Sequence, residues 1–147
     1  MKSKVDTAER LFVDGFSCAQ SVMAAFCEEY DMDIHTGLKT ACGLGGGCGL
    51  GELCGVISGG TLVVGLKFGQ HDLEDNESKA NCRAKRDEFV GKFTEMHGSA
   101  TCRGLLGFDI LTEEGEEKYM SLFIDRATAP CVKFVKGAAQ ILAELGY

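Results

Sequence analysis

The sequence is short of several residues and patterns on which common protein classes depend. It has one proline and no tryptophan, and its 15 Lys and Arg are outnumbered by 22 Asp and Glu. The resulting net charge of −7 argues against general binding to nucleic acid or to anionic membranes, both of which need a basic surface. Asp6, Glu9 and Arg10 stand where a signal peptide would need an apolar run.

Long apolar segments are also missing. The longest one, residues 53–68, is interrupted by four glycines and is too short to cross a bilayer. We therefore expect a cytoplasmic protein that is not an integral membrane protein.

Several familiar motifs are absent as well. No C-x-x-C pair occurs, which argues against a thioredoxin-type active site, the usual zinc knuckle and covalent c-type haem. The glycine-rich run GLGGGCGLG at residues 43–51 contains neither of the two common phosphate-binding patterns, and no predicted strand precedes it. It therefore indicates a tight or flexible loop and not a nucleotide cradle.

What is abundant is cysteine, with eight residues, and glycine, with 20. In the cytoplasm thiols are kept reduced, so an unusual cysteine content points to metal or redox chemistry. The length of 147 residues is typical of one domain, and no linker or repeat divides it. We expect a single domain over residues 1–147.

The patterning predicts an all-α fold, a compact single-domain bundle of about six or seven helices. Apolar residues recur at helical spacing, good N-caps precede several of these segments, and few runs alternate apolar with polar residues. Gly55 and Gly59, four residues apart, let another backbone come close. The expected helices are 5–14, 17–30, 33–42, 52–69, 77–97, a short turn near Cys102, 112–125, and a last helix that opens at Thr128-Ala129-Pro130.

Four cysteines fall in the first turns of predicted helices: Cys18, Cys54, Cys102 and Cys131. Free backbone N–H groups and the positive end of the helix dipole favour a thiolate at such positions. Each of these thiols is therefore predicted to be acidic, reactive and a good metal ligand. Because a bundle gathers several helix ends in one place, we expect the four to form one shared site.

The other four cysteines are predicted to play lesser parts. Cys27 and Cys82 lie within apolar stripes and are expected in the core. Cys42 and Cys48 flank or lie in the glycine loop and are candidates for auxiliary ligands or a resolving thiol. The amides of this loop can donate hydrogen bonds to a cluster or to thiolate sulfur. The glycines expected to contact a cofactor are Gly46, Gly47, Gly49 and Gly55.

Four segments together resemble the family of redox-active C-GCAxxG-C-C proteins, and the resemblance covers nearly the whole chain. They are GFSCAQSV at 15–22, GLGGGCGLGELCGVISGG at 43–60, CRGLLGFDILTEEG at 102–115 and PCVKFV at 130–135. The resemblance implies that the four defining cysteines fall on Cys18, Cys54, Cys102 and Cys131. One departure is visible, since Val56 stands where the family's CGAxxG element has alanine.

The resemblance also implies redox activity, an origin among anaerobes and genes that lie near those of transporters. Three functions remain open. The first is electron transfer through an iron–sulfur cluster or other thiolate-bound metal, because four thiolates in one place repel unless a cation neutralises them. The second is a thiol–disulfide oxidoreductase. The third is a non-catalytic accessory or sensor for a membrane transporter.

Each function implies a partner, a redox protein for the first two and a transporter for the third. Whether the protein is an enzyme stays open, and oxidoreductase is the class expected if it is one. The sequence indicates neither the disulfide pairing nor the oligomeric state.

Overall fold

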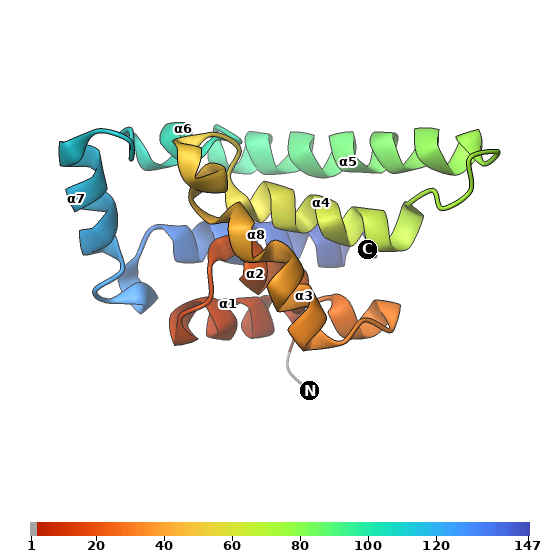
Figure 1. Cartoon of the computed structure of the whole chain (residues 1–147), viewed down its shortest axis with the longest axis horizontal. Helices are drawn as coiled ribbons and strands as arrows, with labels where there is room; N and C mark the ends of the chain where they lie inside the picture. The colour runs from red at the N-terminus through yellow and green to blue at the C-terminus, as the bar shows by residue number, and fades with distance from the viewer. Residues whose placement is uncertain (1–2) are drawn as a thin grey trace.

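The regular structure of the chain is built from helices. The computed structural model describes residues 3–147, and within that range the only extended pairing is a single bridge between Leu53 and Thr101 (Figure 1). The predicted all-α fold is confirmed, with eight α-helices in the described range. They are α1 (Lys4–Asp14), α2 (Cys18–Ala24), α3 (Ile34–Ala41), α4 (Gly55–Phe68), α5 (Asn76–His97), α6 (Cys102–Leu106), α7 (Glu113–Leu122) and α8 (Cys131–Glu144). Four short helical turns join them: η1 (Cys27–Tyr30), η2 (Cys42–Leu44), η3 (Gly47–Gly51) and η4 (Arg126–Thr128).

Local capping explains where the short helices α2 and α6 begin. The Ser17 hydroxyl accepts from the Gln20 amide at 3.3 Å, while the Gln20 side chain accepts from the Ser17 amide at 3.0 Å. This capping box fixes the first turn of α2. Thr101 caps α6 by accepting from the Gly104 amide at 2.9 Å. In both helices a cysteine follows the cap directly, so the caps position those two thiols.

The core lies between α1, α2, α4, α5 and α8. In Figure 1, α5 runs along one side of the molecule over α4, and α7 stands at one end. α2 packs most extensively against α4, and α1 packs against α8. A Cβ at Gly59 would lie 2.5 Å from the Ala19 carbonyl oxygen, so α2 and α4 pack backbone to backbone there. This close approach matches the one expected for the glycine pair in α4.

Two predicted helices have different bounds. The expected helix at 17–30 stops at Ala24, because the Phe26 amide bonds to the Met23 carbonyl and tightens the chain into η1. The last helix begins at Cys131 and not at Thr128, whose hydroxyl donates to the Asp125 carbonyl at 3.1 Å. Pro130 explains the break, since it disfavours helical backbone at the residue before it, which is extended here.

Within residues 3–147 we find no helix that combines the length and the apolar character needed to cross a membrane.

Candidate functional site

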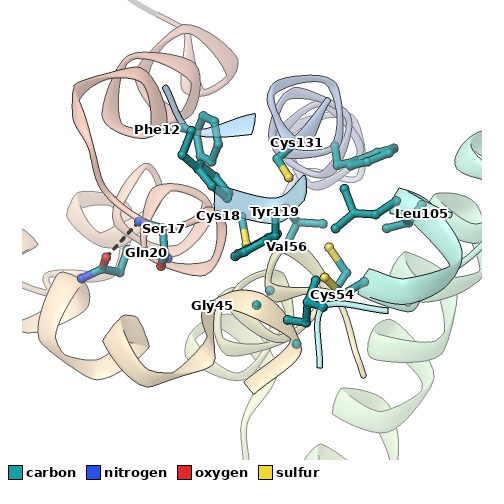
Figure 2. Close-up of a pocket in the computed structure, with 18 of the residues that line it drawn as sticks. Phe12, Ser17, Cys18, Gln20, Gly45, Cys54, Val56, Leu105, Tyr119 and Cys131 are labelled. Atoms are coloured by element: carbon teal, nitrogen blue, oxygen red, sulfur yellow. Dashed lines mark hydrogen bonds between the residues drawn. The ribbon is translucent and has the colours of Figure 1, made fainter. Parts of the chain in front are cut away.

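All four cysteines from predicted helix starts line one cavity of about 530 Å³. The cavity lies between α2, α4, α6, α7 and α8, with the glycine loop on one side. Figure 2 shows the sulfurs of Cys18, Cys54 and Cys131 facing the same space. Cys54 and Cys102 are buried, each with 7% of its surface exposed, and Cys18 and Cys131 are half-buried.

A short antiparallel bridge brings Cys54 and Cys102 to neighbouring positions. The Cys54 amide donates to the Ala100 carbonyl at 2.8 Å, and the Cys102 amide donates to the Glu52 carbonyl at 2.6 Å. Both cysteines therefore flank the bridge on the same face of the pleat. This pairing holds the beginnings of α4 and α6 side by side although the two cysteines are far apart in the sequence.

Cys18 is the acidic thiol of the set. Hydrogen bonding with the neighbouring Cys54 thiol is the largest cause that lowers the pKa of Cys18. Burial opposes ionisation, but the backbone amides of Gly46 and Ala19 add further hydrogen bonds, and the net effect lowers the pKa of Cys18 to about 7. At neutral pH about half of the Cys18 side chains are therefore thiolates.

The other three thiols are held neutral. The hydrogen bond that Cys54 gives to Cys18, followed by burial, raises the pKa of Cys54 far above its ordinary value. Burial and the nearby Cys18 charge raise the pKa of Cys102 to about 11 and that of Cys131 to about 12. The prediction that all four helix starts acidify their thiols is therefore wrong for three of them, because the interaction with Cys18 dominates for Cys54 and desolvation dominates for Cys102 and Cys131.

The glycine loop reaches the cavity and supplies backbone donors. Gly46, Gly47, Gly49 and Gly55, the four glycines expected near a cofactor, all line the cavity. Gly46 has a φ of 65° and donates its amide to Cys18, as expected for an amide of this loop. A side chain at Gly55 would collide with the Cys18 sulfur, so glycine is needed there for α4 to approach α2.

The remaining cysteines are not among the residues that line the cavity, although Cys48 lies between two glycines that do. Cys42 and Cys48 are exposed, and their auxiliary role stays a prediction. Cys27 is buried and directs its thiol to the Met23 carbonyl at 3.4 Å. Cys82 is half-buried on α5 and packs against the core. The core positions expected for Cys27 and Cys82 agree with these contacts.

Two wall residues, Arg126 and Tyr119, were not singled out by the sequence. Arg126 donates its Nε–H to the Phe12 carbonyl at 2.6 Å and a second N–H to the Phe16 carbonyl, and its guanidinium stacks on the Phe12 ring. Tyr119 lies in the cavity, where burial raises the pKa of its hydroxyl. Tyr119 lies on α7, and Phe123 follows the end of this helix four residues later. Aromatic residues at this spacing are the sequence signal that one face of α7 points inward.

A metal or an iron–sulfur cluster would find suitable donors in the cavity but not a suitable arrangement of them. Four thiols are a donor set that soft metals prefer. As the side chains stand, however, no three Cys, His, Asp or Glu between residues 3 and 147 are grouped closely enough to hold a metal ion. The donor chemistry suits a metal, but the arrangement does not fit one.

One comparison with known proteins gives a match. A family model described as "Putative redox-active protein (C_GCAxxG_C_C)" matches residues 16–145. No curated protein and no solved structure matches the chain. The matched range includes every residue that lines the cavity apart from Phe12 and Gly15.

Proposed function

Because the chain belongs to the C_GCAxxG_C_C family of redox proteins, we propose that Cys18 and Cys54 are a redox-active dithiol pair of a thiol–disulfide oxidoreductase. The observations that carry this proposal are that both thiols line one cavity and that Gly55, the residue after Cys54, lies directly against the Cys18 sulfur. The low pKa of Cys18 and the raised pKa of Cys54 place one charged sulfur and one protonated sulfur in the same cavity. Attack followed by resolution needs this arrangement of one charged and one neutral sulfur.

The exchange proceeds in two balanced steps. The Cys18 thiolate attacks one sulfur of a substrate disulfide, so that a new sulfur–sulfur bond forms and the second substrate sulfur leaves as a thiolate. Cys54 then gives its proton to a departing thiolate and attacks the Cys18 sulfur, which releases the rest of the substrate. The second substrate thiolate takes its proton from water, so the substrate gains two electrons and two protons, and the pair becomes a disulfide. An external dithiol or a redox partner protein reduces the pair again.

Cys102 and Cys131 remain thiols during this exchange. Their pKa values of about 11 and about 12 leave almost no thiolate at neutral pH. They keep the cavity around Cys18 uncharged apart from the attacking sulfur. The cycle requires a compartment in which thiols are kept reduced, such as the cytoplasm expected from the sequence.

Electron transfer through an iron–sulfur cluster or other thiolate-bound metal is the second candidate. The presence of four thiols around one cavity favours it. Anaerobic purification separates the two candidates: a colourless, metal-free protein with titratable thiols supports exchange, whereas a brown protein with stoichiometric iron supports the cluster.

A trapping experiment tests the dithiol pair directly. After mild oxidation, peptide mapping without reductant is expected to show a Cys18–Cys54 disulfide. In the Cys54→Ser variant, Cys18 is expected to hold the substrate as a stable mixed disulfide. The Cys82→Ser variant, altered on α5 away from the cavity, is the control and should map like the unmodified protein. A protein in which Cys18 forms neither product contradicts the proposal.

A further inference from the structure

The cavity is the right size for a small molecule and has mostly apolar walls. Its volume of about 530 Å³ lies within the roughly 300–1,000 Å³ typical of small-molecule sites. Apart from the cysteines and glycines, most of its wall is hydrophobic. The apolar wall residues are Phe12, Val56, Leu105, Leu106, Ile110, Tyr119, Met120, Phe123 and Phe134.

The wall offers no free charge to a substrate. Among the residues described, the only charged side chain on it besides the Cys18 thiolate is Arg126. Its guanidinium is already bonded to the Phe12 and Phe16 carbonyls and stacked between the rings of Phe12 and Phe123. Two of its N–H groups are therefore already bonded, and the ion is held in the wall and not free to move to a substrate carboxylate. An anion that enters this cavity loses its hydration, finds no cation that is free to move to it, and meets the charge of the Cys18 thiolate.

The surface around the cavity also disfavours anions. The chain carries a net charge of −7. The first turn of α7 holds three exposed glutamates, Glu113, Glu114 and Glu116, and the same helix supplies Tyr119 and Met120 to the cavity wall. This outer repulsion is screened by salt, whereas the lack of a partner inside the cavity is not.

The burial of the thiols also limits which disulfides can reach them. Cys54 has 7% of its surface exposed, so the resolving sulfur is reached only through the cavity. The attacking Cys18 is half-buried and lines the same cavity, so a substrate disulfide must bring one sulfur into this space. Figure 2 shows that Tyr119, Val56 and Leu105 surround the sulfurs.

From these walls we infer that the Cys18–Cys54 pair acts on small, uncharged disulfides with apolar flanks, and not on anionic or protein disulfides. The inference rests on the proposed function and adds its substrate class. The reaction is the exchange written above: the small disulfide takes up two electrons and two protons and leaves as two thiols. An external small dithiol restores the pair.

Matched substrates test the selectivity. Dipropyl disulfide and 3,3′-dithiodipropionate have the same three-carbon chains, but the second carries two carboxylates; insulin supplies protein disulfides. The rate of Cys18–Cys54 disulfide formation is measured with each, at low and at high salt, and divided by the rate with N-acetylcysteinamide as a free reference thiol. We expect a normalised preference of about tenfold or more for dipropyl disulfide over the dianion, which persists at high salt.

Two lysine variants test whether the cavity wall causes the preference for the uncharged disulfide. Met120 lies on the cavity wall and is 65% exposed, and Met96 on α5 is 50% exposed and lies outside the cavity. Met120→Lys should raise the ratio of the dianion rate to the dipropyl rate several-fold, because it supplies the missing partner. Met96→Lys should leave this ratio unchanged.

The outcomes separate the two proposals. If Cys18 reacts with all three substrates in the proportions of the free thiol, the substrate class is wrong and the dithiol pair stands. The substrate class is also wrong if Met96→Lys changes the ratio as much as Met120→Lys does. If Cys18 and Cys54 form a disulfide with none of the substrates, the proposed function itself falls.

Discussion

Removing the Cys54 thiol tests the hydrogen bond on which the proposed chemistry depends. The pKa of Cys18 is lowered from 9.0 to about 7, with the Cys54 thiol as the largest cause. In Cys54→Ala this donor is lost, and the pKa of Cys18 should rise toward 9.0. Cys54→Ser keeps a hydrogen-bond donor at the same place and should leave the pKa low.

The size of the effect follows from two opposing changes. If the pKa returns fully to 9.0, the thiolate fraction at pH 7 falls from about one half to about 1%. The more basic thiolate is roughly eightfold more nucleophilic, because nucleophilicity rises with a Brønsted coefficient of about 0.45. The alkylation rate at pH 7 therefore falls by up to about sixfold. Far above pH 9 the variant reacts up to about eightfold faster, so the two pH profiles cross.

Peptide-resolved alkylation by iodoacetamide measures these profiles for Cys18 separately from the other thiols. Cys82→Ala serves as the control, because Cys82 lies on α5 outside the cavity. A Cys54→Ala profile with the same midpoint as the unmodified protein, and no crossing, would show that Cys54 does not stabilise the Cys18 thiolate.

Three further predictions concern stability, each read from denaturant unfolding. Gly59→Ala should lower the free energy of unfolding by about 1–3 kcal/mol, since its Cβ meets the Ala19 carbonyl, whereas Gly65→Ala on the same helix meets nothing and should be neutral or stabilising. Above pH 9 the folded chain holds the Cys131 proton that the unfolded chain releases. Stability should therefore fall by about 1.4 kcal/mol per pH unit more steeply than in Cys131→Ala, up to about pH 12. Arg126→Met should cost about 2–4 kcal/mol by leaving two carbonyls without donors, and an unchanged stability would contradict that role.

Much of the fold can be predicted from caps and from the spacing of apolar residues, because these features act within one or two helical turns. Ser17 and Thr101 are caps whose partners lie three residues away. The helical spacing of apolar residues predicts which faces are buried, and Gly59 predicts the close approach of α4 to its neighbour. The break before α8 is also local, but it requires weighing Pro130 against the preceding cap signal, and the proline dominates.

The electrostatics of the site could not be predicted in the same way. A cysteine at a helix start is recognisable from the sequence, but its burial and its neighbours depend on which helices meet. Cys131 is placed against α7 and the other thiols by tertiary packing, and burial raises its pKa. Arg126 is likewise an ordinary charged residue in sequence, and only the fold shows that it joins η4 to the end of α1.

The uneven acidity of the four thiols bears on how the cavity works. Burial and the Cys18 charge make Cys102 and Cys131 together about 7 kcal/mol harder to deprotonate at pH 7 than two ordinary thiols. A metal bound by all four thiols would have to displace these protons, whereas in the metal-free protein only Cys18 ionises readily. Dithiol exchange needs one thiolate at a time: Cys18 supplies the first, and once Cys18 is in the mixed disulfide Cys54 no longer lies beside the charge that helps to hold its proton. The same cavity is therefore poorly suited to hold several negative sulfurs at once and well suited to bring one of them to a neutral disulfide.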